Sequence, residues 1–279
     1  MPQTCRIYSK NADYQKFEVL KTNRNKRYKY NEFWVEGVRN LNAAVQNGWC
    51  IHSLVYTPDK PLSDWAPGMI ASTQPQVNYE LTAPLMAELS GKADTSELMA
   101  VVEMRKDDLS ALPLGDTPLL AMFDRASNKG NLGTILRSCD ALGVDALVLT
   151  GHAVDLYDVD VVVSSMGSLF CVPTVRVADN DTLERYVEGL RGRYPGFQLV
   201  GTTAHKQHPI DGCDLTKPTM LMIGNETDGL CAYWKEHCDL LCTIPMAESS
   251  YASSFNVGCA ATVMFYEAQR QRRAALAEK

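Results

Sequence analysis

From Leu119 onward, short apolar segments of strand length alternate with stretches that have the apolar spacing of helices, and this alternation constrains the fold more than any other feature of the chain. Strands of a parallel sheet are buried on both faces and joined by helices, so they read as apolar runs separated by amphipathic stretches. The pattern therefore predicts an α/β fold with a parallel sheet. Its strands are expected at 119–124, 146–150, 174–177, 198–204, 219–224 and 240–246.

Helical patterns lie between these strands and after the last one. The stretch 132–143 carries apolar residues on one face and ends at a glycine, which is typical of a helix terminus. Residues 179–191 begin with Asn and Asp side chains of the kind that cap helices. A last helix is expected over about 255–273, with the hydroxyls of Ser253 and Ser254 as its candidate caps.

The first third of the chain predicts a smaller α/β unit. Residues 38–45 have the spacing of a helix that stops before Gly48, and a second helix is expected after Thr82. Prolines are frequent in 58–75, so this passage is predicted to be loop more than regular structure. Strands are expected at 51–57, 77–81 and 98–104.

Length and composition favour a protein of two globular domains. The chain has 279 residues. A linker near 109–118 would separate residues 1–112, a basic N-terminal arm with a small domain, from a domain of residues 113–279. With 46% hydrophobic residues the chain is too apolar to be disordered, and no apolar segment is long enough to span a membrane. Nine cysteines without a CxxC pair, and first residues without the apolar core of a secretory signal, favour the reducing cytoplasm.

Positive charge is concentrated at the front of the chain. Residues 1–40 contain nine Lys or Arg and four Asp or Glu, although the whole chain has a net charge of −6. Within 21–30, cations alternate with tyrosines and amides, a composition that contacts phosphates by charge and bases by stacking. A solvated helix face is an equally good interpretation. The candidate RNA-binding residues are Lys21, Arg24, Lys26 and Arg27.

No metal site is expected. His205 with His208, and His237 with Cys238 and Cys242, are the candidate clusters, and neither has the paired spacing of a structural zinc site. These histidines are interpreted as polar loop residues.

Three strand-to-helix loops of the second domain carry side chains suited to chemistry. Such loops lie beyond the carboxyl ends of parallel strands, where ligands bind in sheets of this class. The first loop, 124–137, contains two glycines, two asparagines and Arg137 near the opening of the next helix. Exposed backbone N–H groups and a guanidinium indicate an anion site, most simply for a phosphate. A plain turn followed by a solvated Arg137 is the alternative.

The second loop, 221–230, and the third loop, 242–261, argue against several classes of enzyme. Gly224 and Gly229 have the spacing of the glycines in a phosphate-binding P-loop, but Leu230 stands where that motif needs lysine, so nucleotide hydrolysis is disfavoured. No GxGxxG follows a predicted strand, which disfavours an ordinary Rossmann enzyme. The serines of 242–261 have no histidine nearby in the sequence, so a serine hydrolase is weakly supported.

Taken together and in this order, the three loops resemble the motifs of the SpoU (TrmH-like) RNA 2′-O-ribose methyltransferases of the SPOUT superfamily. The family's N-x-G-x-x-x-R motif matches Asn131, Gly133 and Arg137. Its G-N-E-x-x-G motif matches Gly224, Asn225, Glu226 and Gly229. Its I-P-M and S-L-N-V motifs match Ile244, Pro245 and Met246, then Ser254, Phe255, Asn256 and Val257, with Phe255 in place of the usual leucine. Residues 33–44 resemble the family's L30e-like substrate-recognition domain.

The resemblance implies a fold and a reaction. The fold would be a C-terminal SPOUT α/β domain with a deep trefoil knot, one of the rare exceptions to unknotted topology, and a smaller N-terminal L30e-like α/β domain that recognises RNA. The reaction would be methyl transfer from S-adenosylmethionine to a ribose 2′-hydroxyl of structured rRNA or tRNA. A homodimer is implied, in which Arg137 acts beside the cofactor of the other subunit, and neither a metal nor a membrane takes part.

The resemblance also assigns residues. The cofactor-binding residues would be Thr203, Ala204, Gly224, Asn225, Gly229, Ile244, Pro245, Met246 and Phe255. The catalytic residues would be Asn131, Arg137, Glu226, Ser254 and Asn256. Because a guanidinium is a very poor base at neutral pH, Arg137 is expected to anchor a phosphate and to stabilise the developing alkoxide. A non-catalytic RNA-binding protein on the same scaffold, for instance in ribosome assembly, is the alternative.

Overall fold

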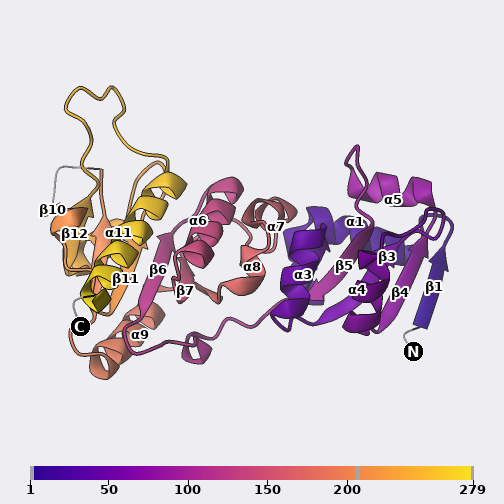
Figure 1. Cartoon of the computed structure of the whole chain (residues 1–279), viewed down its shortest axis with the longest axis horizontal. Helices are drawn as coiled ribbons and strands as arrows, with labels where there is room; N and C mark the ends of the chain where they lie inside the picture. The colour runs from indigo at the N-terminus through magenta and orange to yellow at the C-terminus, as the bar shows by residue number, and fades with distance from the viewer. Residues whose placement is uncertain (1–2, 205–207, 278–279) are drawn as a thin grey trace. The chain divides into compact units, whose positions relative to one another are not determined.

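The computed structural model of the chain describes residues 3–204 and 208–277. The chain divides into two compact units, which we call the N-terminal unit (residues 1–105 and 155–171) and the C-terminal unit (residues 106–154 and 172–279). Each unit has a sheet of its own (Figure 1). In the ranges that the structure describes, no helix has both the length and the apolar sequence needed to cross a bilayer.

The sheet of the N-terminal unit mixes parallel and antiparallel pairs. Strands β1, β4 and β3 pair in parallel, whereas β3 with β5 and β5 with β2 pair antiparallel. The register of β3 against β5 shifts between Ile51 and Ser53, an irregularity that redirects side chains at this point of the sheet. In sheet order, the strands described are β1 (Gln3–Ile7), β4 (Val77–Leu81), β3 (Ile51–Tyr56), β5 (Leu98–Glu103) and β2 (Glu32–Glu36).

Helices of the N-terminal unit bury apolar side chains against this sheet. Phe17 of α1 packs on Trp34 of β2 with 5.5 Å between the ring centroids, inside a core that also contains Leu20. The stretch 155–171 adds two short helices to the unit although it follows residues of the other unit in the chain. The helices are α1 (Ala12–Thr22), α2 (Arg24–Tyr30), α3 (Val38–Gln46), α4 (Trp65–Thr73), α5 (Ala83–Ser90), α7 (Val159–Ser165) and α8 (Ser168–Cys171).

The structure confirms most of the elements predicted here and corrects two predictions. The front of the chain is not an arm, because it forms β1, α1 and α2, which belong to the folded N-terminal unit. The helix predicted at 38–45 is α3, and the three predicted strands are β3, β4 and β5. The proline-rich passage 58–75, however, contains α4, so its prediction as loop was wrong. Pro67 lies in the first turn of α4, where a backbone N–H would have no partner within the helix, and a proline is therefore tolerated.

Every described strand pair in the sheet of the C-terminal unit is parallel. Strand β6 lies between β11 and β7, so the direction in which strands are added reverses beside β6. Ligands bind beyond the carboxyl ends of strands at such a reversal. In sheet order, the strands described are β10 (His208–Pro209), β12 (Leu240–Thr243), β9 (Gln198–Thr202), β11 (Thr219–Ile223), β6 (Leu119–Asp124), β7 (Ala146–Thr150) and β8 (Thr174–Val177).

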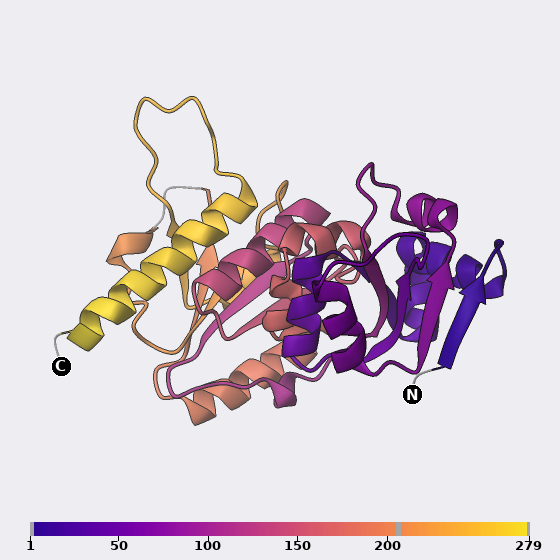
Figure 2. The same cartoon turned by 45° about the vertical axis from the view of Figure 1, so that its right-hand side comes forward.

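Helices pack on this sheet through apolar side chains. Leu183 and Val187 of α9 share one core with Met122 of β6. Helices α6 and α11 lie side by side, as Figure 2 shows. The helices are α6 (Lys129–Ala141), α9 (Asn180–Arg193), α10 (Ala232–His237) and α11 (Val257–Ala277), and single turns of 3₁₀-helix lie at Leu109–Ala111 and Ile210–Gly212.

All six strands predicted for this unit are present, which confirms the α/β class. Strand β12 ends at Thr243, before the predicted end, because Pro245 has no N–H to continue a ladder. The last helix begins at Val257, and Asn256 caps it instead of the predicted serines. The side-chain oxygen of Asn256 accepts hydrogen bonds from the backbone N–H groups of Gly258 at 2.9 Å and Cys259 at 3.3 Å.

Candidate functional site

A cavity of about 750 Å³ lies at the carboxyl edge of the sheet in the C-terminal unit. Its walls come from the ends of β9, β11 and β12, from the loop 224–230, and from residues of the segment 244–257. Most of this segment projects away from the sheet as a long loop before α11 begins (Figures 1 and 2). Two of the three loops that the sequence singled out therefore line one cavity.

The loop after β11 is closed so tightly that its first residue must be glycine. A Cβ atom on Gly224 would lie 2.1 Å from the backbone nitrogen of Leu230 and 2.2 Å from the carbonyl carbon of Gly229. Asn225 and Gly229 exchange two backbone hydrogen bonds of 3.0 Å, and the side chain of Asn225 accepts from the N–H of Thr227 at 2.8 Å. A side chain at position 224 would therefore have no room inside the loop, and the loop keeps this shape only with glycine there.

Arg125 ties this loop to the end of β6. Its Nη2 atom donates to the carbonyl oxygen of Gly229 at 2.8 Å, and its own carbonyl oxygen accepts from the side chain of Asn225 at 2.7 Å. The neighbouring carboxylate of Asp124 is buried and accepts from Arg125 Nε at 3.1 Å and from the N–H of Cys231 at 2.9 Å. The sequence indicated a cation at this strand exit, but it did not predict that Arg125 would bond to Asp124 at the end of β6 or to the loop after β11.

Asn131, Glu226 and Asn256 form a chain of hydrogen bonds that joins the first turn of α6, the loop after β11 and the residue before α11. Asn131 Nδ2 donates to Glu226 Oε1 at 3.0 Å, and Asn256 Nδ2 donates to Asn131 Oδ1 at 3.1 Å. The hydroxyl of Ser127 donates to the other carboxylate oxygen of Glu226. Burial raises the pKa of Glu226, but the hydrogen bonds from Ser127 and Asn131 together outweigh it, and the pKa lies below the ordinary 4.5. Glu226 is therefore an ionised acceptor at neutral pH.

Most of the predicted cofactor-binding residues line the cavity. Pro245 is the exception and does not contribute to the wall. Phe255 is partly exposed, so this departure from leucine adds apolar surface at the cavity rather than filling a core. The predicted cofactor-binding residues that line the cavity are Thr203, Ala204, Gly224, Asn225, Gly229, Ile244, Met246 and Phe255. Their part in binding a cofactor stays a prediction at this point.

The predicted catalytic residues separate into three groups. Glu226, Ser254 and Asn256 line the cavity. Asn131 does not line it but is bonded to two residues that do. Arg137 lies on the exposed side of α6, and it makes no hydrogen bond or ion pair with any residue in the described ranges. Within one chain, Arg137 is therefore not part of the cavity.

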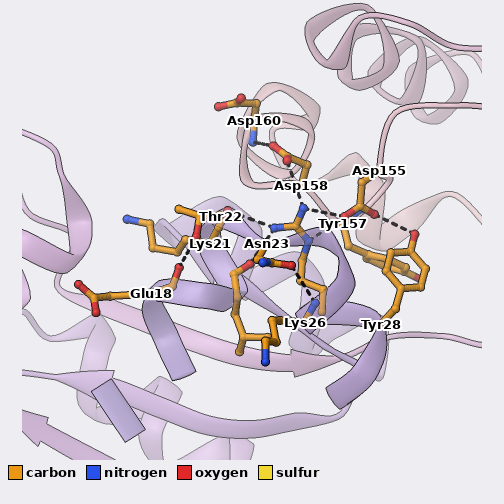
Figure 3. Close-up of polar contacts among 12 residues, drawn as sticks. Glu18, Lys21, Thr22, Asn23, Lys26, Tyr28, Asp155, Tyr157, Asp158 and Asp160 are labelled. Carbon is orange, nitrogen blue, oxygen red and sulfur yellow. Dashed lines mark hydrogen bonds and ion pairs between the residues drawn. The ribbon is translucent and has the colours of Figure 1, made fainter. Parts of the chain in front are cut away.

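The predicted RNA-binding cations lie on or beside α2, and for Arg27 the prediction was wrong. Arg27 is 1% exposed. Its Nε donates to Asp155 Oδ2 at 2.7 Å and its Nη2 to Asp158 Oδ2 at 3.2 Å, and both aspartates are labelled in Figure 3. Tyr28 donates to the remaining oxygen of Asp155 at 2.9 Å. A guanidinium held by two carboxylates inside the protein has no donors left for a phosphate.

The other three cations differ in exposure. Lys21 is half-buried and donates to the carbonyl oxygens of Leu89 and Ser90, and burial lowers its pKa. Arg24 is exposed and lies over the ring of Tyr28 at 5.5 Å. Lys26 is partly exposed. Of the four predicted RNA-binding cations, only Arg24 and Lys26 therefore remain candidates for contact with RNA.

The cavity offers backbone polar groups, apolar side chains and charged side chains of both signs. Ile244, Met246 and Phe255 supply the apolar surface, and Glu226, Asp228 and Lys235 supply the charged groups. This combination suits a flat base attached to a charged, polar chain. In the part of the chain that the structure describes, no cluster of metal-ligating side chains lies at the cavity. His205, half of one candidate metal pair, lies outside the described residues.

Comparison with known proteins gives matches in both units. Residues 118–266 match the model of the SpoU rRNA Methylase family, and residues 11–100 match that of the SpoU L30e-like domain. A 23S rRNA (uridine(2479)-2′-O)-methyltransferase from Streptomyces viridochromogenes is 43% identical over 272 residues, which are 97% of this chain and 94% of the relative.

Solved structures with the same fold include complexes with a cofactor. The SpoU methyltransferase AviRb from Streptomyces viridochromogenes, in complex with AdoMet, has a TM-score of 0.87 and 40% identity over 95% of this chain and 100% of that chain. An AdoMet-bound rRNA methyltransferase from Sinorhizobium meliloti has a TM-score of 0.85 and 26% identity over 96% of this chain and 98% of that chain.

Proposed function

The chain belongs to the SpoU rRNA Methylase family, and we propose on this premise that its RNA substrate is 23S ribosomal RNA. It is an S-adenosylmethionine-dependent methyltransferase that acts on a ribose 2′-hydroxyl of RNA. One observation supports the choice of 23S RNA: the 43% identity to a 23S uridine 2′-O-methyltransferase extends over 97% of this chain, so it includes the L30e-like domain as well as the methylase domain. We accordingly propose a cytoplasmic protein that modifies the large ribosomal subunit.

The cavity fits S-adenosylmethionine. Its volume of about 750 Å³ is within the range of about 300–1,000 Å³ for sites of small molecules. The glycine at 224 keeps the loop 224–230 compact, and this loop lies opposite the apolar side chains that would hold an adenine ring. When bound, S-adenosylmethionine supplies an electrophilic methyl carbon on a cationic sulfur. Among the charged groups at the cavity, the ionised carboxylate of Glu226 favours that cation.

Positioning is the catalytic contribution that we assign to Asn131, Glu226 and Asn256. Glu226 accepts from Ser127 and Asn131, and Asn131 accepts from Asn256, so each group in this chain of hydrogen bonds fixes the next. A fixed polar wall orients the ribose hydroxyl toward the methyl carbon, and such alignment lowers the barrier by removing the entropy of a bimolecular encounter. Ser254 lines the same cavity and is proposed to bind the substrate through its hydroxyl.

Arg137 is proposed to act in a homodimer, beside the cavity of the other subunit. Its exposure on α6 and its lack of partners among the described residues support this arrangement. There it would bind a phosphate of the RNA and stabilise the alkoxide that forms as the ribose oxygen attacks. The hydroxyl proton would leave to an RNA phosphate oxygen or to water, because a guanidinium is a very poor base.

A deep trefoil knot in the C-terminal domain is also part of the proposal. The loop 224–230 and the segment 244–257 would form it, and their convergence on one cavity supports this. The L30e-like domain would choose the RNA, with Arg24 and Lys26 on α2 contacting phosphates.

The test of the substrate is a comparison of RNA pools. The purified protein is incubated with methyl-labelled S-adenosylmethionine in three separate reactions, which contain unmodified 23S rRNA, 16S rRNA or tRNA. We expect stoichiometric label in 23S rRNA alone. Equal or greater labelling of tRNA or 16S rRNA would refute the assignment of the substrate.

A further inference from the structure

Three side chains of types that bind metals lie together in the N-terminal unit, although the sequence has no metal-binding motif there. The Sγ atom of Cys50, a ring nitrogen of His52 and a carboxylate oxygen of Glu103 all lie within 4.8 Å of one another. Cys50 directly precedes β3 and Glu103 ends β5, which is the antiparallel neighbour of β3. Sequence reasoning did not pair these residues, because only the strand pairing brings positions 50 and 103 together.

The backbone holds the cluster in place. The N–H of Glu103 donates to the carbonyl oxygen of Cys50 at 2.9 Å. His52 lies at the register shift between Ile51 and Ser53, and irregularities of this kind redirect a side chain locally. The three groups are therefore positioned by the sheet and not by a flexible loop.

His52 is also oriented by a second carboxylate. Its Nδ1 atom lies 2.6 Å from Oε1 of Glu32, a residue that is only 7% exposed, and the other oxygen of Glu32 lies 2.6 Å from Nζ of Lys16. Donation from Nδ1 to Glu32 leaves the lone pair of the ring on Nε2, which lies 3.3 Å from Oε2 of Glu103. Histidines that bind metals are typically held in this way, by a carboxylate that accepts from the nitrogen opposite the metal.

We propose that Cys50, His52 and Glu103 bind a divalent zinc-type cation, with Glu32 as the carboxylate that orients His52. A thiolate, an imidazole and a carboxylate are the three ligand types that zinc takes in proteins, and three protein ligands leave a fourth tetrahedral position for water. The thiol of Cys50 loses its proton when the Zn–S bond forms, so one proton leaves to solvent for each ion bound. The site lies in the N-terminal unit, and this proposal does not rest on the methylation reaction.

The competing account is a network without a metal, in which His52 pairs with Glu32 and Glu103 and the thiol of Cys50 keeps its proton and hydrogen-bonds to Glu103. The test therefore depends on the thiol. The full-length protein is freed of metal with a chelator, kept reduced, and titrated with Co²⁺ and then Zn²⁺. We expect one ion per chain, a thiolate-to-cobalt absorption band, and displacement of cobalt by zinc.

Matched variants assign the ligands. Cys50→Ser is expected to abolish the absorption band, whereas Cys171→Ser, which removes another exposed thiol of the same unit, leaves it unchanged. Glu32→Gln is expected to weaken binding about 10- to 100-fold while retaining the band. Unchanged circular dichroism of the metal-free variants separates loss of binding from loss of fold. Absence of stoichiometric binding in the natural protein, or a band that survives in Cys50→Ser, would overturn the proposal.

Discussion

Arg24, Lys26 and Arg27 belong to one short helix, α2, yet their surroundings give them different tasks. Arg27 is enclosed, and its guanidinium donates to Asp155, to Asp158 and to two backbone carbonyl oxygens. Arg24 lies toward solvent over the ring of Tyr28, and Lys26 is partly exposed. Residues that look equivalent in a basic stretch thus divide into one that is buried in an ion-pair network and two that are at least partly exposed.

Removal of the buried guanidinium is expected to destabilise the protein. Arg27→Ala leaves two carboxylates without their partner inside the N-terminal unit, and breaking a buried pair in this way costs about 3–5 kcal/mol. Urea unfolding followed by tryptophan fluorescence measures the loss. Lys26→Ala is the control: stability should change by less than about 0.5 kcal/mol, while RNA binding weakens and its salt dependence becomes shallower. A fully stable Arg27→Ala protein would contradict the assignment.

The ionisation of Glu226 makes the stability of the folded protein depend on pH. Because its pKa in the folded protein lies below the ordinary 4.5, its ionisation stabilises the fold above that pH, and this contribution is lost as the pH falls through the lowered value. Glu226→Gln removes the contribution. The difference in unfolding free energy between the natural protein and this variant should therefore be largest near neutral pH and shrink below pH 4.5. A difference that stays constant or grows in acid would show that the carboxylate is not stabilised by Ser127 and Asn131.

Loops and strand ends, more than helices, decide what the C-terminal unit can bind. The loop after β11 returns on itself through the Asn225–Gly229 pair and is fixed to the end of β6 by Arg125. The segment after β12 reaches the cavity and ends where Asn256 both caps α11 and bonds to Asn131. One asparagine thus links the start of a helix to the polar wall of the site.

The tight turn at Gly224 makes a sharp prediction. Gly224→Ala forces a methyl group into backbone atoms of Gly229 and Leu230, so we expect the unfolding free energy to fall by about 1–3 kcal/mol. We also expect the variant to lose S-adenosylmethionine binding, which calorimetric titration measures. Gly189→Ala is the matched control, because this position in α9 is open and alanine favours helices. Normal cofactor affinity in Gly224→Ala would mean that this loop does not form the binding wall.

Local patterns were sufficient for most elements of the fold and insufficient for the partners of single charges. The buried strands of the C-terminal unit were visible as apolar runs, and Gly48 correctly marked the end of α3. Helix α4 was missed because proline density was given more weight than the position of Pro67 in the first turn. Burial of Arg27 was not foreseeable, since its partner Asp155 is 128 residues away along the chain.

At the scale of the whole molecule, the chain does not divide at one point. The stretch 155–171 belongs to the N-terminal unit, although residues 106–154 before it and 172–279 after it belong to the C-terminal unit. The sequence suggested a single linker near 109–118, because linkers are recognised by composition and an inserted pair of short helices has no distinct composition. The polar chain Asn131–Glu226–Asn256 was anticipated only through the family resemblance, as no spacing rule joins three separate segments.

The proposed homodimer predicts complementation between two inactive variants. Arg137→Ala should lower kcat about 100- to 1,000-fold while cofactor binding is kept, and Arg185→Ala, another exposed arginine of the C-terminal unit, should leave activity unchanged. A heterodimer of Arg137→Ala with Glu226→Gln, isolated by two affinity tags, has one site with both groups intact and should recover about half of the natural activity. A heterodimer as inactive as its parents would place Arg137 in the site of its own subunit.

The identity of the methylated atom tests the account most directly. After reaction with S-adenosylmethionine, 23S rRNA is digested to nucleosides and the products are separated by mass spectrometry. The account predicts one 2′-O-methylated nucleoside per RNA, formed by the natural protein and strongly reduced with Arg137→Ala. Methylation of a base, or no methyl transfer to 23S rRNA at all, would contradict it.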